Sequence, residues 1–116
     1  MAFYRASIGG GGGGGGRSAT GSFITNTSAT SGYKVVTGFR PKYISVFRSN
    51  STNPSAAIYN YDINPNQFFK ALPSSCAWRN FESANFMSLV SVDNDGFTFW
   101  TNSSYSSYTW DYWASE

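Results

Sequence analysis

The chain has 116 residues, which gives room for one domain with one modest hydrophobic core. Aromatic residues make up 19% of the sequence and charged residues only 12%, against roughly 25% charged residues in an ordinary domain. The net charge of +2 is small and the basic residues are scattered, so we expect no binding to nucleic acid or to anionic lipid.

The cysteine and histidine content narrows the chemistry further. Cys76 is the only cysteine and histidine is absent, which excludes an intrachain disulfide and a zinc site built from these two residue types. The first residues lack the apolar segment of a secretory signal, and no run approaches the ~20 apolar residues of a membrane helix. We therefore expect synthesis in the cytoplasm, no membrane insertion and no cofactor.

The chain begins with a short segment predicted to be extended, residues 1–8, followed by eight glycines, Gly9–Gly16. One interpretation of the glycine tract is a flexible linker. Another is an ordered arm in a threefold helix of the polyproline type, which would span about 25 Å. A phosphate-binding loop is the weakest interpretation, because Arg17 and Ser18 follow the tract and no lysine does. We assign residues 1–17 to an extended glycine-rich N-terminal arm and residues 18–116 to a single domain.

Residues 18–85 are predicted to form short strands separated by turns. The clearest is 42–48, where Ile44 and Val46 alternate with side chains that face the other way. A turn or bulge at 39–41 precedes it, because Pro41 cannot donate a hydrogen bond to a central ladder. The predicted elements are a loose strand within 18–31, strands at 33–37, 42–48, 57–61 and 68–72, and an ambiguous segment at 78–85 that is either one helical turn or a loop.

The C-terminal region carries the strongest local signal. Two apolar runs, 86–92 and 97–101, flank the turn sequence 93–96, which predicts a β-hairpin. Gly96 suits the left-handed position of a three-residue turn with a bulge. A third strand is predicted at 108–114, and the three antiparallel strands together are expected to serve as the folding core.

No stretch shows a helical stripe of apolar residues over 11 positions or more. Strands recur at intervals of about ten residues with turns between them, which is typical of a sandwich or a small barrel. The fold class predicted from these patterns is all-β, an antiparallel, jelly-roll-like β-sandwich that follows the N-terminal arm.

Groups suited to catalysis are few, and we expect no catalytic site. The chain has no histidine that could stabilise Cys76 as a thiolate. No sequence feature brings two carboxylates together across a cleft, as a glycosidase requires. Asp93 and Asp95 resemble the start of a calcium loop, but the later bidentate acid is missing, so we expect no metal. A hydrolase that uses Glu82 with an aspartate is the remaining enzymatic alternative.

Aromatic residues crowd the last part of the chain. On an alternating strand Trp110 and Tyr112 share one face, while Trp113 takes the other. These rings can fill the core, lie buried between subunits or stack on sugars. The candidates for an interface or for glycan stacking are Trp100, Tyr105, Tyr108, Trp110 and Trp113.

Four segments occur in a characteristic order: Gly38-Phe39-Arg40-Pro41-Lys42-Tyr43-Ile44, Ile58-Tyr59-Asn60, Asp95-Gly96-Phe97-Thr98-Phe99, and Tyr108 to Ala114. This pattern resembles small β domains in virion proteins of tailed bacteriophages, such as tail, fibre and baseplate appendages. The start of the chain, residues 1–7 before the glycine tract, is similar to short phage virion proteins with glycine-rich heads.

The resemblance implies a structural, non-enzymatic virion protein of a tail, a fibre or a head appendage. It implies a homo-oligomer, with a trimer favoured, that is joined to other virion proteins by its N-terminal arm. The residues expected in this docking arm are Phe3, Tyr4, Arg5, Gly9, Gly16 and Arg17. The alternative is a carbohydrate-binding module that recognises a glycan of the host surface through exposed Trp and Tyr rings.

Overall fold

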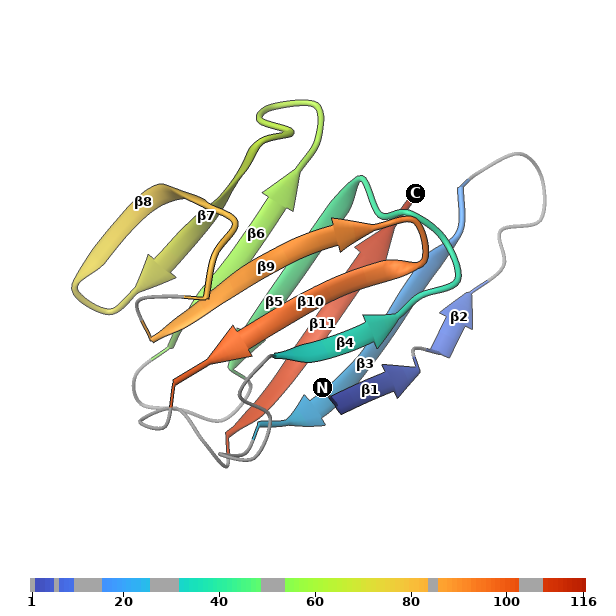
Figure 1. Ribbon diagram of the computed structural model, residues 1–116, viewed down its shortest axis with the longest axis horizontal. Coiled ribbons are helices and arrows are strands. Elements are labelled where there is room, and N and C mark those ends of the chain that lie inside the picture. The colour runs from blue at the N-terminus through green and yellow to red at the C-terminus, as the bar shows by residue number, and fades with distance from the viewer. Residues whose placement is uncertain are drawn as a thin grey trace.

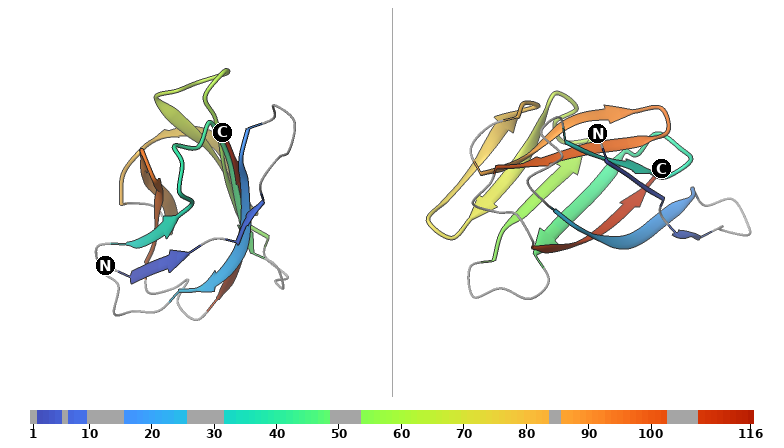
Figure 2. Two further views of the ribbon diagram at one scale, coloured as in Figure 1. Left: turned by 90° about the vertical axis from the view of Figure 1, so that its right-hand side faces the viewer. Right: turned by 60° about the horizontal axis from the view of Figure 1, so that its bottom comes forward.

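The computed structural model describes residues 2–5, 7–9, 16–25, 32–48, 54–83, 86–102 and 108–116, with only the backbone of residues 2–5 and 7–9. The described residues form strands and turns and contain no helix. Two sheets lie face to face as a sandwich (Figure 2), which confirms the predicted fold class.

The smaller sheet has four strands in the order β1-β4-β10-β9. All its pairs are antiparallel except β1 with β4, which is parallel. Its strands are β1 (Ala2–Arg5), β4 (Tyr33–Val36), β9 (Met87–Asp93) and β10 (Gly96–Thr101). In Figure 1 this sheet lies in front of the larger one.

The larger sheet has seven strands in the order β2-β3-β11-β5-β6-β7-β8, and every pair is antiparallel. Its strands are β2 (Ser7–Gly9), β3 (Ser18–Ile24), β5 (Tyr43–Arg48), β6 (Ala56–Asn60), β7 (Gln67–Leu72), β8 (Ser75–Asn80) and β11 (Thr109–Ser115). The chain passes between the sheets from β1 to β2, from β3 to β4, from β4 to β5, from β8 to β9 and from β10 to β11, which fits the jelly-roll-like pattern.

The core lies between the sheets and is largely aromatic. Trp110 projects from β11 against Phe99 of β10, with ring centroids 4.8 Å apart. Phe23 of β3 meets Phe99 edge to face at 5.6 Å, and Phe97 meets Tyr112 at 5.8 Å. Offset and edge-to-face ring pairs of this kind add to the free energy gained from burying apolar area.

The predicted three-stranded C-terminal sheet is wrong in one respect. β9 and β10 pair as expected, but β11 lies in the other sheet, between β3 and β5. The reason is that Phe99 and Trp110 each project from the inner face of their own strand. The two aromatic strands bury these rings by packing face to face across the sandwich instead of pairing edge to edge.

The β9–β10 hairpin differs from the prediction in its turn. Asp93 pairs directly with Gly96, so Asn94 and Asp95 form a two-residue loop, and the bulge lies between Thr98 and Phe99. Gly96 has φ +157°, and a Cβ at this position would lie 1.9 Å from the carbonyl oxygen of Val35. Glycine is therefore required at position 96 because the backbone of β4 approaches so closely.

The ambiguous segment 78–85 is described as far as residue 83, and this part forms neither a helical turn nor only a loop. Residues 78–80 belong to β8, and residues 81–83 form bends after it. β8 is an edge strand that is held by its ladder with β7, and most of its side chains are exposed. An edge strand with so little burial carries almost no apolar periodicity, so the sequence gives little sign of it.

The N-terminal segment is extended, as predicted, and its backbone pairs with the rest of the same chain. β1 lies beside β4, and β2 lies beside β3, so the segment adds an edge strand to each sheet (Figure 1). Edge strands present unpaired backbone groups, and this pairing satisfies those of β4 and β3. The side chains of Phe3, Tyr4 and Arg5 and the glycines 10–15 lie outside the described residues, so the docking role of this arm stays a prediction.

Candidate functional site

Large apolar side chains from four strands line up across the outer face of the seven-stranded sheet, with Ser45 of β5 between two of them. Strand register places Trp113 opposite Ser45, Ser45 opposite Ile58, Ile58 opposite Phe69, and Phe69 opposite Trp78. Residues paired in this way share one face of a sheet. We call Trp113, Ile58, Phe69 and Trp78 the aromatic row; it crosses β11, β5, β6, β7 and β8.

Much of the aromatic row is accessible to solvent. Trp113, Ile58 and Trp78 are 44%, 42% and 40% exposed, whereas Phe69 is half-buried and meets Trp78 edge to face at 5.6 Å. Four strand spacings of ~4.8 Å separate Trp113 from Trp78, so the row is about 19 Å long. Large exposed apolar side chains that lie together on one face are a feature of interaction surfaces.

The surroundings of the aromatic row are polar but almost uncharged. In the described strands from β3 to β8 of this sheet, Asp111 is the only charged residue at an outward position. The side chains of Gln67 and Asn80 lie beside the row and are joined by a hydrogen bond of 2.9 Å, donated by Gln67 Nε2 to Asn80 Oδ1. Few charges and many aromatic rings are the composition of the centre of a protein interface.

The structure separates the aromatic residues predicted as a site. Trp113 lies in the aromatic row. Trp110 is fully buried, and its Nε1–H donates to Thr25 Oγ1 at 3.4 Å, so for this residue the structure shows the core role. Trp100 is half-buried and projects from β10 away from the core-facing Phe99. Tyr105 lies outside the described residues.

Tyr108 is half-buried and is covered by a cation. The guanidinium carbon of Arg48 lies 3.6 Å from the centroid of the Tyr108 ring, a stacked arrangement. This contact joins the end of β5 to the residue that precedes β11. Tyr108 is therefore placed at an end of the sandwich, apart from the aromatic row.

Sequence reasoning missed the other members of the row. Ile58, Phe69 and Trp78 belong to three neighbouring strands, and only the register between the strands aligns them with Trp113. The alternation of residues 57–61 does predict that Ile58 and Tyr59 face opposite ways. It does not predict which neighbours Ile58 acquires.

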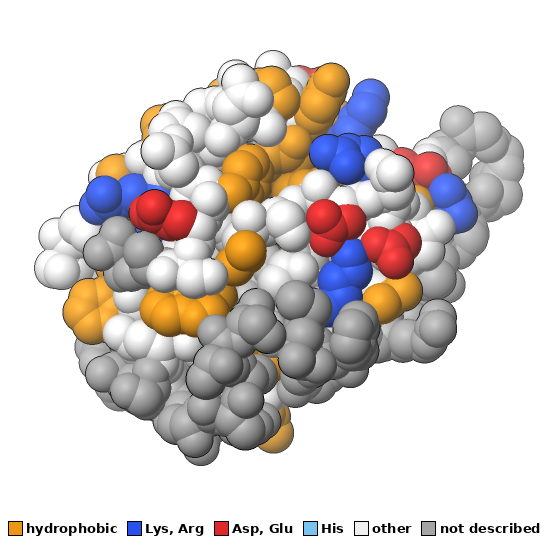
Figure 3. Space-filling model, viewed as in Figure 1, with side chains coloured by type: hydrophobic (Ala, Val, Ile, Leu, Met, Phe, Trp, Pro, Cys, Tyr) orange, Lys and Arg blue, Asp and Glu red, His pale blue; other side chains and the backbone are white. Residues whose placement is uncertain are grey.

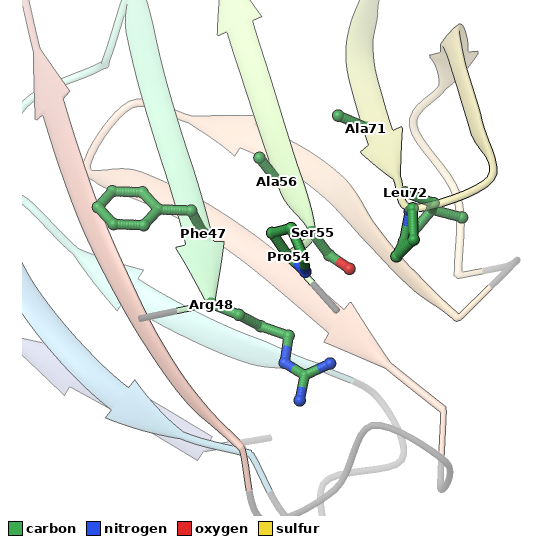
Figure 4. Close-up of a pocket in the computed structure, with 8 residues that line it drawn as sticks. Phe47, Arg48, Pro54, Ser55, Ala56, Ala71 and Leu72 are labelled. Atoms are coloured by element: carbon green, nitrogen blue, oxygen red, sulfur yellow. The ribbon is translucent and has the colours of Figure 1, made fainter. Parts of the chain in front are cut away.

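A cavity of about 340 Å³ lies where β5 ends, β6 begins and β7 ends (Figure 4). We call it the end pocket. Its described lining residues are Phe47, Arg48, Pro54, Ser55, Ala56, Ala71, Leu72 and Pro73. Ser55 is only 3% exposed, and its hydroxyl has no hydrogen-bond partner among the described residues. The walls that Phe47, Ala56 and Ala71 form face outward and are apolar, whereas the Ser55 hydroxyl is shielded from solvent on the inner side of β6.

The outer face of the four-stranded sheet holds a charged cluster, and Figure 3 shows acidic and basic side chains close together on this side of the molecule. Lys34 Nζ lies 2.7 Å from Asp93 Oδ2 and 2.8 Å from Asp95 Oδ1. Burial lowers the pKa of Lys34, but its hydrogen bonds to Asp93 and Asp95 outweigh burial and raise the pKa overall. The hydrogen bond from Lys34 in turn lowers the pKa of Asp95. These carboxylates hold the hairpin turn against β4.

Arg17, predicted as part of the docking arm, is bound to its own chain. Its guanidinium forms a two-point contact with Glu116, with Nε–Oε1 at 3.0 Å and Nη2–Oε2 at 2.9 Å. The hydrogen bonds from Arg17 lower the pKa of Glu116 to about 2. Gly16, another predicted arm residue, lies against the same side chain, because a Cβ on Gly16 would meet Glu116 Cβ at 2.9 Å.

One lysine faces the core. Lys70 of β7 is 3% exposed, and its Nζ donates to Ser88 Oγ at 3.0 Å. Burial lowers the pKa of Lys70 to about 8, and the nearby Arg79 adds to this shift.

No group of three or more His, Cys, Asp or Glu side chains that could hold a metal ion occurs within the described residues. The same residues include no helix that is long and apolar enough to cross a membrane. No protein-family model, no curated protein and no solved structure matches the chain.

Proposed function

We propose that this chain is a structural protein that assembles with copies of itself through the aromatic row, as a component of a bacteriophage virion. The single observation that carries the assembly is the exposed, aromatic and nearly uncharged outer face of the seven-stranded sheet. The virion setting, in a tail, a fibre or a head appendage, rests on the sequence resemblance.

The composition of this face favours contact between identical copies. In a two-fold contact the same surface lies on both sides of the interface, so like charges easily come close. With Asp111 as the only outward charge in the described strands from β3 to β8, such repulsion is small. Burial of the row yields about 25 cal/mol per Å² of apolar surface, and the polar residues around it can form the rim of an interface.

The oligomeric state tests this proposal. Sedimentation velocity or light scattering over a wide concentration range is expected to show particles larger than one chain, and the resemblance favours a trimer. Trp113→Ser and Trp78→Ser should each weaken association at least tenfold while the unfolding temperature stays close to that of the original protein.

A matched control distinguishes this surface from exposed apolar residues in general. Ile63 is 69% exposed and lies in the turn after β6, away from the aromatic row, so Ile63→Ser should leave association unchanged. A protein that is monomeric at the highest concentration contradicts the proposal, and so does equal loss of association in all three variants.

A glycan-binding module is the second candidate, because the same face presents Trp78 beside the linked amides of Gln67 and Asn80. Indole rings can stack on sugars while amides bind hydroxyl groups. Glycan-array binding, with quenching of tryptophan fluorescence as a second readout, tests this function. Binding that is lost in Trp78→Ser, in a chain that remains monomeric, would favour the glycan over assembly.

A further inference from the structure

We propose that the sandwich binds an acidic oligosaccharide, a short chain of sugars with carboxylate groups, at the end where β5 begins and β6 ends. Two hollows of about 340 Å³ and 330 Å³ lie at this end, and Arg40 lines both. We call the two hollows together the Arg40 cleft. The inference does not depend on assembly through the aromatic row, and each proposal can fail without the other.

Two side chains of the Arg40 cleft, Lys42 and Tyr61, reach it from the inner side of the larger sheet. They extend the ladder of β5 and β6, because the backbone N–H of Tyr61 donates to the carbonyl oxygen of Lys42 at 2.8 Å. Ile44 and Tyr59, two positions away along these strands, are paired and buried in the core. Side chains alternate along a strand, so Lys42 and Tyr61 face the same inner side. Lys42 is exposed and Tyr61 is 46% exposed, so a ligand can reach both.

Arg40 extends across the same end of the sandwich toward the smaller sheet. Its Nη1 donates to Oδ1 of Asn94, in the turn between β9 and β10, at 3.3 Å. Burial raises the pKa of Tyr59, and the positive charge of Arg40 opposes this shift, so Arg40 lies near this inner-face hydroxyl. The bond to Asn94 occupies one of the five N–H donors of the guanidinium. Arg40 is exposed, and its charge is accessible to a ligand from solvent.

The charge of the Arg40 cleft is not balanced by the protein. No carboxylate of the described residues forms an ion pair with Arg40 or Lys42. The carboxylate of Asp62 accepts a hydrogen bond from the Tyr43 hydroxyl, and the acids of the charged cluster bind Lys34. In Figure 3 basic side chains gather beside apolar ones above that cluster. Two accessible cations without a nearby partner favour an anionic ligand, and a guanidinium matches the geometry of a carboxylate.

The other walls of the Arg40 cleft favour a sugar over a simple anion. The Tyr61 ring lines one hollow, with its centroid 5.8 Å from Lys42 Nζ. Phe81 and the exposed Asn66 line the other hollow. Aromatic rings can pack on the apolar face of a sugar, and amides can bind its hydroxyl groups. Each hollow suits roughly ten non-hydrogen atoms, at ~30 Å³ for each water-sized group, which is about one sugar unit. Because Arg40 belongs to both hollows, a carboxylate bound there can lie between two units.

The test uses trigalacturonate and its fully methyl-esterified form, titrated into the full chain by calorimetry and by NMR. The ester keeps the rings and hydroxyl groups but lacks the charges. At low salt the acid is expected to bind with a dissociation constant on the order of 1 mM or below, and at least about tenfold tighter than the ester or sulfate. Added salt should weaken the binding of the acid. Absence of acid binding at about 20 mM ligand, roughly twentyfold above that constant, overturns the proposal, and so does equal affinity for the ester or for sulfate.

Variants assign the binding to the Arg40 cleft. Arg40→Gln should lower the affinity for trigalacturonate at least about tenfold, Lys42→Gln several-fold, and both should reduce the preference for the acid over the ester. Tyr61→Ser should weaken binding of acid and ester alike, because it removes a ring and no charge. Arg79→Gln is the matched control, since it removes an exposed cation on β8, outside the described lining of both hollows. It should bind as the original protein does. Thermal unfolding confirms that each variant is folded. Unchanged binding in Arg40→Gln overturns the assignment, and so does an equal loss in Arg79→Gln.

Discussion

The two faces of the seven-stranded sheet differ in what covers them, and β11 shows this within one strand. Trp110 and Trp113 are three residues apart, yet Trp110 is fully buried and Trp113 is 44% exposed. The inner face meets the four-stranded sheet and packs its rings there. The outer face has no second layer among the described residues. The same residue type therefore supports the fold on one side and is available for binding on the other.

Each face also has one residue that departs from its general character. Among its buried residues the inner face has one charged side chain, Lys70, which lies beside Ser88. Among the described strands from β3 to β8, the outer face is uncharged except for Asp111. Burial of Lys70 lowers stability through desolvation of its charge, whereas Asp111 remains in contact with water.

The largest expected effect comes from the two tryptophans of β11. Trp110→Ala should lower the free energy of unfolding by about 3–5 kcal/mol, because a fully buried ring is lost and a cavity remains. Trp113→Ala should change it by less than about 1 kcal/mol, measured by urea unfolding at a concentration where the protein is monomeric. Equal losses in the two variants would break the distinction between the faces.

Lys70 on the inner face should make the free energy of unfolding depend on pH. Its pKa is about 8 in the folded protein, against 10.5 normally, so the unfolded chain binds the additional proton between these values. The stability of the original protein should therefore rise from pH 8 to pH 10.5, by at most about 3 kcal/mol. Lys70→Met should lack this rise, and the stability difference between the two proteins, followed by urea unfolding, should shrink as pH increases. A constant difference across this range would contradict the burial of a charged group at this position.

A smaller effect is expected at the charged cluster on the four-stranded sheet. The folded-state pKa of Asp95 lies below its ordinary 3.8, so its ion pair with Lys34 stabilises the fold above that pH. This contribution is lost as pH falls through the folded-state pKa. Lys34→Met should cost on the order of 1 kcal/mol at pH 7 and progressively less below pH 3.8. An equal cost at pH 7 and pH 2, measured by thermal unfolding, would show that the lysine acts through packing alone.

Local patterns allowed much of the fold to be predicted. The hairpin of β9 and β10, the alternation in β5 and the opposite directions of Trp110 and Trp113 all depend on neighbouring residues along the chain. β8 was missed because an exposed edge strand shows no clear alternation. The placement of β11 in the other sheet was also missed, since the choice of a partner strand depends on packing between distant segments.

The candidate site could be predicted only in part, for the same reason. Trp113 could be singled out from its own strand. Its alignment with Ile58, Phe69 and Trp78 requires the register of five strands, which no local signal provides. Ser55 looks like an ordinary loop serine in the sequence. Its burial at the end pocket follows from where three strands end.

The bond between Arg17 and Glu116 has a topological consequence. Ser18 pairs with Ser115, and Glu116 N–H donates to the Arg17 carbonyl oxygen at 2.9 Å. Residues 17 and 116 therefore lie side by side. A linker of a few residues could join residue 116 to residue 17, and new termini could then be placed in another loop. We therefore expect circular permutants of this domain to fold. In a tandem fusion, a short linker can join the end of one copy to the start of the next.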